Sequence, residues 1–290
     1  MSVDLQRVEL TDWGVIRVAG ADTVKFLQGQ LSNDIERISA ERSILAGYHN
    51  PQGRAVALLR MVKTASGDVA AVLPRELVAD VISRLRKFVL RAKVALTDES
   101  ESVRVVGITG VDVVPDVAKA SWLSVEGTGR RFIGVLPPET GDALADLPEV
   151  DRSVWTQLDI QEGVPHVYKA TSEAFVAQML NLDVLGGIAF DKGCYTGQEV
   201  IARAHYRGRV KRRMQRFRTN ESVTLNRGDA GRLQDGRSFK VVEALQLTDG
   251  RCEFLAIAPL VAGSAEEASE TGGSPAITAE QTPLPYSLPE

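Results

Sequence analysis

The N-terminal part of the chain combines hydrophobic runs typical of strands with hydrophobic spacing typical of helices. Residues 13–20 form a short apolar run that predicts a strand. Asp22 follows at an N-cap position, and apolar residues then recur at helical spacing over residues 23–31. Residues 75–90 show the strongest helical pattern, with apolar side chains on one face of nearly every turn. We therefore expect helices interleaved with strands from the start of the chain.

The predicted strands are joined largely by tight turns. Residues 43–50 and 54–63 are two β-type runs separated by a segment whose Pro51 and Gly53 suit a turn, which predicts a hairpin. Because hairpins join antiparallel strands, this pattern of hairpin strands with flanking helices favours an α+β fold over a doubly wound parallel sheet. Further strands are predicted at residues 68–74, 93–99, 102–110, 121–127 and 130–138, and a short helix at 139–147.

The helical patterns stop after residue 206. Residues 210–219, 238–247 and 252–260 are strand-like and are separated by Gly, Asp and Asn, which predicts a small C-terminal β domain. Residues 261–274 are small, polar and rich in Gly and Ser, as in a mobile loop. We expect the chain to divide into units at residues 1–100, 101–205 and 206–290.

The composition is that of an ordinary soluble globular protein, with 44% hydrophobic and 25% charged residues in a chain of 290. The formal net charge of −4 argues against a surface that binds nucleic acid throughout, although a local patch can still do so. The only cysteines, Cys194 and Cys252, match neither a metal-cluster cage nor a disulfide scaffold. Since neither a targeting segment nor a long apolar run is visible, we expect a cytoplasmic protein.

The stretch around Cys194 carries the clearest local motif. Thr196 and Glu199 have the spacing of a capping box, which predicts a helix from Thr196 to about Gly208. Cys194 then lies just before the positive end of that helix, where the thiolate is favoured, and Lys192 adds to this effect. The alternative is that Cys194 is a small buried residue beside a tight turn.

Two further features each have a functional and a structural interpretation. A basic run without acidic residues could bind phosphates or RNA, or it could protect a strand edge from aggregation. Trp13 and Trp155 could stack on a flat heterocycle or simply belong to the core. The basic run comprises Arg203, Arg207, Arg209, Lys211, Arg212, Arg213, Arg216 and Arg218.

Several segments together resemble one known family. Residues 181–213 contain the run KGCYTGQE and strongly resemble the signature of the YgfZ family of folate-binding proteins, relatives of the aminomethyltransferase of glycine cleavage. Residues 26–35, 49–54 and 155–165 are similar to other segments of that family. The resemblance covers about residues 1–215, and the remainder is similar only in the order of its domains.

The resemblance implies a ring of three units around a central channel. Two ferredoxin-like α+β units and a C-terminal unit like a small β-barrel would surround tetrahydrofolate or a one-carbon derivative of it. Such a protein would act as an accessory to the assembly or repair of iron–sulfur clusters and to iron–sulfur-dependent tRNA modification. Its partners would be iron–sulfur proteins or tRNA-modifying enzymes, and direct contact with tRNA is left open.

The resemblance also implies which residues serve the site. Cys194 and Lys192 are the candidates for a thiol-dependent catalytic step, and they belong to the signature loop that would face the channel. The residues expected to contact folate are Trp13, Trp155, Gln161, Asn181, Tyr195, Gln198, Glu199 and Arg203. No metal ligands are expected, because two distant cysteines cannot supply the four ligands of an iron–sulfur cluster.

The alternative is a folate-dependent one-carbon transferase resembling the aminomethyltransferase. In that enzyme the hairpin turn is followed by acidic residues that serve the chemistry, whereas here Arg54 is followed by apolar residues such as Val56 and Ala57. Gln161 stands where the aminomethyltransferase offers a glutamate to the pterin, and Glu162 lies one place further on. These departures make classical aminomethyltransferase activity the less favoured interpretation. A third interpretation is a pure RNA-contact module that uses the basic run.

Overall fold

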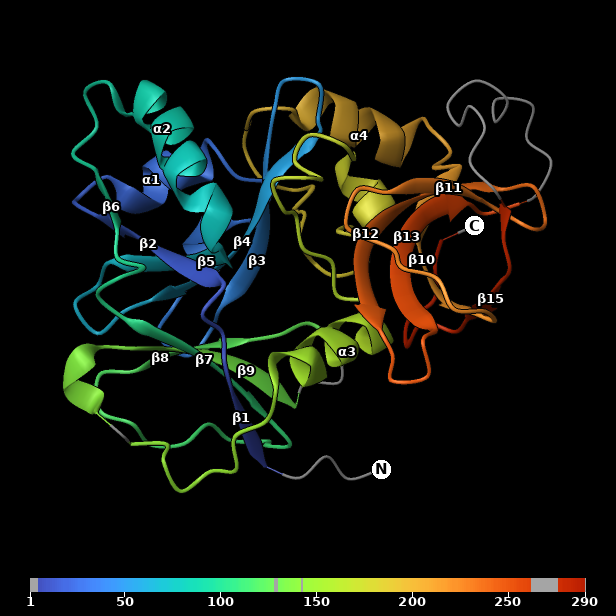
Figure 1. The fold of residues 1–290 in the computed structure, drawn as a ribbon. Helices are drawn as coiled ribbons and strands as arrows, with labels where there is room; N and C mark the ends of the chain where they lie inside the picture. Colours follow the sequence, from blue (N-terminus) through green and yellow to red (C-terminus); the bar gives the residue numbers. More distant parts are fainter. Residues whose placement is uncertain (1–4, 128–129, 142, 262–275, 290) are drawn as a thin grey trace.

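A computed structural model describes residues 5–127, 130–141, 143–261 and 276–289. Within these residues the chain forms three β-sheets, with helices packed against and between them (Figure 1). Nearly all neighbouring strands are antiparallel, as the predicted hairpins imply. The mixed α and β architecture expected from the sequence is therefore confirmed.

The first sheet has the strand order β3-β4-β5-β2-β6. The predicted hairpin is present, because β3 pairs with β4 across a turn in which Gly53 has φ +71°. Asp22 precedes the first helix as expected, but its carboxylate accepts a hydrogen bond from the Lys93 amide at 2.7 Å instead of capping the helix. The strands are β2 (Trp13–Ala19), β3 (Ile44–His49), β4 (Ala55–Lys63), β5 (Val69–Pro74) and β6 (Ala95–Asp98), and the helical segments are α1 (Thr23–Gln28), η1 (Ile35–Arg37), η2 (Arg75–Leu77) and α2 (Val78–Val89).

The second sheet has the order β1-β7-β9-β8 and takes its first strand from the N-terminus. Helix α3 (Arg152–Glu162) lies between this sheet and the third sheet (Figure 1). The short helix predicted at 139–147 is wrong: the described residues there form a 3-10 turn, η3 (Pro138–Thr140), which begins at the second of two consecutive prolines, and then irregular turns. The strands are β1 (Gln6–Glu9), β7 (Arg104–Thr109), β8 (Ser121–Ser124) and β9 (Arg131–Leu136).

The third sheet is nearly a closed barrel and has the order β14-β11-β12-β13-β10-β15. Its two edge strands, β14 and β15, are separated only by Thr278, so one short segment joins both edges. The mobile loop predicted at 261–274 lies, apart from Val261, outside the described residues. The strands are β10 (Arg212–Thr219), β11 (Ala230–Leu233), β12 (Ser238–Gln246), β13 (Cys252–Pro259), β14 (Ala276–Ile277) and β15 (Ala279–Thr282).

The hydrophobic cores cross the divisions expected at residues 100 and 205. Strand β1 pairs with β7, so it belongs to the second sheet although it precedes the first. After α3 the chain returns to the first sheet, and the side chains of Phe175, Leu180 and Ile201 join the same buried cluster as Leu58. This returning segment contains η4 (Ala177–Leu180) and ends in α4 (Gln198–Tyr206).

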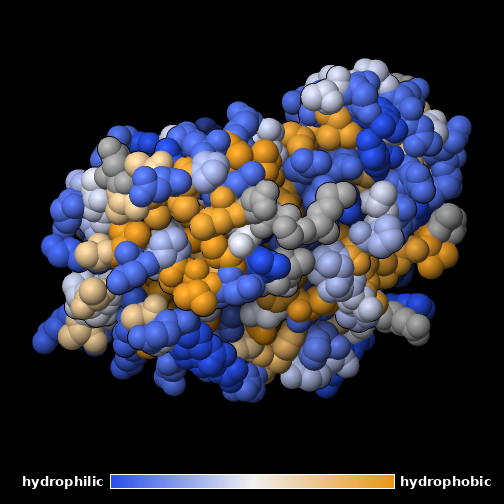
Figure 2. All heavy atoms as spheres, turned by 90° about the horizontal axis from the view of Figure 1, so that it is seen from below, coloured by the Kyte–Doolittle hydropathy of each residue, from blue (hydrophilic) through white to orange (hydrophobic). Residues whose placement is uncertain are grey.

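Most large apolar side chains are buried between these layers. Figure 2 shows one face, on which hydrophobic side chains gather near the middle and are bordered by hydrophilic ones. None of the helices in the described ranges would reach across a lipid bilayer with an apolar surface. The exposed large apolar side chains of the described residues are scattered along the chain, with two of them at the end of α2 and two in α4: Leu5, Phe88, Leu90, Val113, Val200, Tyr206 and Val261.

The packing of Trp155 against Gly107 generates the first prediction. Trp155 is fully buried, and a Cβ atom at Gly107 would overlap the six-membered ring of the indole. We expect Gly107→Ala to lower the free energy of unfolding by about 1–3 kcal/mol through overpacking. Urea denaturation followed by circular dichroism measures this change.

Gly29→Ala is the matched control. Gly29 has φ −82°, and the nearest atom to an added Cβ would lie 3.7 Å away. We expect its unfolding free energy to stay within about 0.5 kcal/mol of the unchanged chain. Equal stability of the Gly107→Ala and Gly29→Ala variants would contradict close packing of the tryptophan on β7.

Candidate functional site

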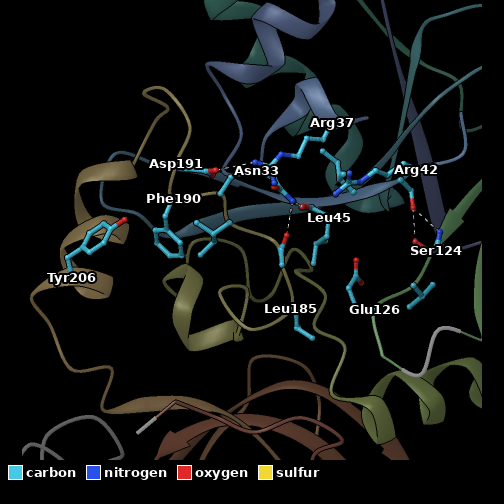
Figure 3. Close-up of a pocket in the computed structure, with 16 residues that line it drawn as sticks. Asn33, Arg37, Arg42, Leu45, Ser124, Glu126, Leu185, Phe190, Asp191 and Tyr206 are labelled. Atoms are coloured by element: carbon cyan, nitrogen blue, oxygen red, sulfur yellow. Dashed lines mark hydrogen bonds and ion pairs between the residues drawn. The ribbon is translucent and has the colours of Figure 1, made fainter. Parts of the chain in front are cut away.

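A cavity of about 720 Å³ opens between the first sheet, the second sheet and the segment that precedes α4 (Figure 3). Strand β3 contributes Leu45, and the segment after β8 contributes Glu126. The segment before α4 contributes Phe190 and Asp191. Cavities of about 300–1,000 Å³ are the usual size for small-molecule sites. Its other lining residues are Asn33, Arg37, Arg42, Ser43, Ile44, Ser124, Val125, Leu185, Gly186, Ile188, Ala189 and Tyr206.

A second cavity of about 420 Å³ adjoins the first. Both cavities are lined by Glu126 and Leu185, and the second extends to Pro285 and Tyr286 near the C-terminus. The two cavities together reach from the first sheet to the C-terminal segment, with Glu126 on their common wall. Any ligand that spans them therefore passes a carboxylate.

Glu126 is held in place by Arg60 of β4. The Arg60 guanidinium donates to one Glu126 oxygen from Nε at 3.1 Å and from Nη2 at 2.7 Å. Only 1% of the Arg60 side chain is exposed, whereas 15% of the Glu126 side chain is. A buried guanidinium needs a charged partner, and it fixes that partner on the cavity wall. The carboxylate is thereby oriented before any ligand binds.

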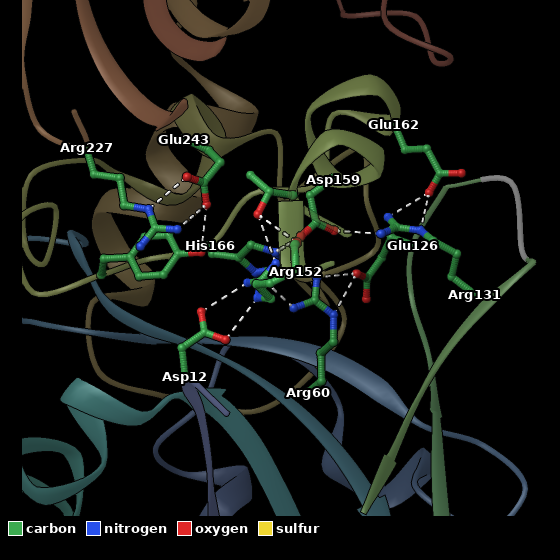
Figure 4. A network of polar contacts seen from close by, with 12 residues as sticks. Asp12, Arg60, Glu126, Arg131, Arg152, Asp159, Glu162, His166, Arg227 and Glu243 are labelled. Carbon is green, nitrogen blue, oxygen red and sulfur yellow. Dashed lines mark hydrogen bonds and ion pairs between the residues drawn. The ribbon is translucent and has the colours of Figure 1, made fainter. Parts of the chain in front are cut away.

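Behind Glu126 lies a buried network of charged side chains (Figure 4). His166 Nδ1 lies 3.3 Å from an Arg60 nitrogen, and His166 Nε2 lies 2.9 Å from Asp159. Because arginine only donates, Nδ1 must accept, so His166 is neutral and carries its proton on Nε2. Burial lowers the pKa of His166, which agrees with a neutral ring.

The network continues into the second and third sheets. Arg131 of β9 donates to Asp159 at 2.8 Å and to Glu162 at 2.8 Å. Burial alone would raise the pKa of Asp159, but His166 and Arg131 hold it below its ordinary value. Toward the third sheet, the Tyr168 hydroxyl donates to Glu243 of β12 at 2.7 Å. Burial raises the pKa of Tyr168 well above its ordinary value, so the hydroxyl stays a donor.

The two tryptophans expected to contact folate flank this network. Trp13 is 2% exposed, meets His166 edge to face at 4.9 Å and lies beneath the Arg60 guanidinium. Trp155 is fully buried, with the Arg131 guanidinium 4.9 Å from its ring. Neither tryptophan is among the described residues that line the two cavities. Their contact with folate stays a prediction, and their observed role is to enclose the buried charges.

Lys192 attaches the signature loop to the end of α1 and the segment that follows it. Its ammonium group donates to the carbonyl oxygens of Gln28 at 2.8 Å, Leu31 at 2.7 Å and Asn33 at 2.8 Å. Burial lowers the pKa of Lys192 to about 8. All three donors of the ammonium are engaged, so the contact seen here is structural. A catalytic role for Lys192 stays a prediction.

The signature loop turns Cys194 outward and Tyr195 inward. Cys194 is exposed, whereas Tyr195 is 7% exposed and lies beside the buried His49 ring at 6.5 Å. Burial raises the pKa of Tyr195 to about 12 and lowers that of His49 to about 4, so both groups are neutral near pH 7. Cys194 is not among the described residues that line the cavity, although Asp191 in the same loop is.

The predicted capping box is wrong. Helix α4 begins at Gln198, and its N-cap is Gly197 with φ +83°, without a side-chain cap. An added Cβ at Gly197 would lie 2.6 Å from the Asn50 carbonyl oxygen, so the close approach to the hairpin turn sets the start of the helix. Glu199 pairs with Arg203 at 2.9 Å on the exposed face instead of capping the helix.

The remaining predicted site residues are dispersed. Gln198 reaches back to the Gly193 carbonyl at 3.4 Å. Asn181 is buried and donates to the Met214 carbonyl of β10 at 2.9 Å. Gln161 lines a separate polar cavity between α3 and the third sheet. Among the described residues, no group of three or more His, Cys, Asp or Glu side chains is arranged to hold a metal ion.

The side chains of the basic run do not form one continuous positively charged surface. Arg213 is buried against Asp183 at 2.8 Å, and Arg216 lies 3.6 Å from Glu253 of the neighbouring strand β13. Strand β10 lies between β13 and β15, so protection of an exposed edge is also not its role. The arginines that precede β10, including Arg207 and Arg209, are exposed.

The segments 26–35 and 181–213, which the sequence motifs single out, supply part of the cavity lining, but no sequence pattern indicated Glu126, Arg37 or Arg42. Glu126 and Arg60 are separated by 66 positions, and Arg42 and Arg37 lie in a segment without a recognised motif. A single arginine in the apolar strand β4 was the only available signal, because a charge in a buried run requires a partner. That signal indicates a buried ion pair without indicating its partner.

Comparisons with known proteins agree with this architecture. A scan against protein-family models gives no match. The tRNA-modifying protein YgfZ of Yersinia pseudotuberculosis (serotype O:1b, strain IP 31758) is 31% identical over 315 residues, covering 99% of this chain and 94% of the relative. The tRNA-modifying protein YgfZ of Enterobacter sp. (strain 638) is 31% identical over 314 residues, with the same coverage.

A solved structure shares the fold. The glycine cleavage system aminomethyltransferase T from Bartonella henselae superposes with a TM-score of 0.68 at 13% identity, covering 88% of this chain and 78% of that one. This likeness concerns the fold alone, whereas the sequence identity to the curated relatives extends along nearly the whole chain. The chain therefore belongs to the family of the tRNA-modifying protein YgfZ.

Proposed function

We propose that this protein binds tetrahydrofolate or a one-carbon derivative and serves as an accessory protein in iron–sulfur-dependent tRNA modification. The observation that carries the proposal is the Glu126 carboxylate, which Arg60 orients on the common wall of the two cavities. The three sheets would form a ring around the buried network, with the folate beside it. Cluster assembly or repair would be supported in a partner protein.

The donor set of the cavity fits a reduced folate. The pyrimidine edge of the pterin presents N–H donors, and the Glu126 oxygen that Arg60 leaves free can accept from them. The other end of folate carries carboxylates, which suit the arginines at the mouth of the cavity. Arg37 is paired with Asp34 and Asp191, whereas the Arg42 guanidinium has no ion pair with any described residue.

The comparisons support the tRNA-related part of the proposal. The curated relatives are named tRNA-modifying protein, and this chain matches them over nearly their whole length. The folate and iron–sulfur parts rest on the resemblance of the signature segment and on the cavity beside it. Classical one-carbon transfer has less support, because Val56 and Ala57 are buried in β4 where the aminomethyltransferase offers an acid.

The role of Glu126 generates the second prediction. Glu126→Gln keeps an acceptor for Arg60 but removes the charge and one acceptor oxygen from the cavity wall. We expect the Kd for tetrahydrofolate to rise roughly ten- to a hundredfold, because hydrogen bonds to charged groups contribute about 1.5–3 kcal/mol. Isothermal titration calorimetry under anaerobic conditions measures the affinity.

The control for this experiment is Glu36→Gln. Glu36 is exposed and does not line either cavity. Its affinity for tetrahydrofolate should equal that of the unchanged protein, and thermal unfolding should show that both variants are folded. Equal affinity in the Glu126→Gln protein would remove Glu126 from the site.

The exposure of Cys194 generates the third prediction. Cys194 is exposed and Cys252 is fully buried in β13, so a thiol reagent should modify Cys194 rapidly in the folded protein and both cysteines only after unfolding. Because Cys194 does not line the described cavity, saturating tetrahydrofolate should change the rate of alkylation by less than about twofold. Mass spectrometry after timed iodoacetamide treatment locates and counts the modified thiols.

Cys194→Ser is the control, since the folded variant should then resist alkylation. Strong protection of Cys194 by tetrahydrofolate would contradict the placement of the thiol outside the cavity. It would instead place the thiol against the ligand, as the resemblance alone implies.

A further inference from the structure

The C-terminal end of α4 presents a cluster of aromatic rings that the sequence does not reveal. Phe190 and His205 stack with their ring centroids 3.8 Å apart and their planes 16° from parallel. Tyr206 meets His205 edge to face at 4.7 Å, and it is 67% exposed. Phe190 and Tyr206 lie side by side at the edge of the cavity (Figure 3). An exposed tyrosine held by two other rings is a preformed stacking surface.

Arginines continue directly from this cluster. Arg207 and Arg209 follow Tyr206 and are exposed, and neither guanidinium has an ion pair with any described residue. No acidic residue occurs between Glu199 and Glu221. The described acids of the flanking segments are already engaged, because Glu199 pairs with Arg203 and Asp191 pairs with Arg37. The surface around Tyr206 is therefore locally basic in a chain of net charge −4.

The cluster also stands between two cavities. Phe190 and Tyr206 line the cavity described above, whereas His205 and Arg209 line another of about 450 Å³ beside η4. Because Phe190 and His205 are stacked, their rings separate the two hollows. The cluster therefore forms a ridge between the two cavities. A chain-like ligand that crosses the ridge would contact an aromatic ring of the cluster and the Arg209 guanidinium on the side of the second cavity.

We propose that the ridge formed by Tyr206, Arg207 and Arg209 binds single-stranded RNA, such as an unpaired loop of a tRNA. Aromatic side chains beside a basic groove are the combination that binds unpaired nucleotides, since every base has a face that can stack and every linkage carries a phosphate. The excess of positive charge favours a polyanion over an apolar protein surface. Only the identity of the RNA as tRNA rests on the proposed function.

The test measures binding of a fluorescein-labelled RNA hairpin with an unpaired loop to the full-length protein by fluorescence anisotropy at several salt concentrations. Tyr206→Ala should weaken binding by about tenfold through loss of one stacked base, and Tyr206→Phe should retain the affinity. The double variant Arg207→Ala/Arg209→Ala should weaken binding and reduce the slope of log Kd against log salt by about 1.4, as expected for two lost phosphate contacts.

The double variant Lys87→Ala/Arg91→Ala is the charge-matched control, since it removes two exposed cations near the end of α2. It should keep the RNA affinity and the salt slope of the unchanged protein. Equal losses in the two double variants, equal affinities of Tyr206→Ala and Tyr206→Phe, or no RNA binding by the unchanged protein would each overturn the proposal.

Tetrahydrofolate titration of the Arg207→Ala/Arg209→Ala variant separates this proposal from the folate site. Neither arginine lines the cavity with Glu126, so the affinity for folate should be unchanged while RNA binding falls. Loss of folate binding with intact RNA binding in the Glu126→Gln protein would show that RNA binding does not depend on the folate site. Failure of one proposal therefore leaves the other measurable.

Discussion

The buried charge of Arg60 is the constraint on which the arrangement of the three sheets depends. Its guanidinium comes from the first sheet, Glu126 from the segment after β8, and His166 from the segment after α3. A buried charge is tolerated only while its partners stay in place, and removal of one partner commonly costs about 3–5 kcal/mol. The relative positions of these segments are therefore set by one group, and the third sheet joins the network through Tyr168.

The same constraint shapes the candidate site. Glu126 faces the cavity because Arg60 occupies one of its oxygens from within the protein. The Arg60–Glu126 ion pair thus forms part of the cavity wall and also joins the first sheet to the segment after β8. A shift of that segment relative to the first sheet would therefore move the carboxylate in the cavity. A ligand that binds Glu126 would bind preferentially to the assembled arrangement, and by mass action it would stabilise that arrangement.

Local structure could be predicted from the sequence, whereas long-range partners could not. The hairpin around Gly53 and the helix at 75–90 depend on turn chemistry and periodicity within a few residues, and both are present. The capping box failed because the approach of Gly197 to the Asn50 carbonyl decides where α4 begins. Glu126 was missed because its partner lies 66 positions away, and no spacing rule links the two.

The signature loop shows why a motif match alone does not assign chemistry. Lys192 binds three carbonyls at the end of α1 and just after it, and Tyr195 packs beside His49, so these members of the motif hold the loop in position. Cys194 and Glu199 are exposed members of the motif that do not line the described cavity. A rigidly attached loop that presents one thiol to solvent is suited to contact with a second macromolecule.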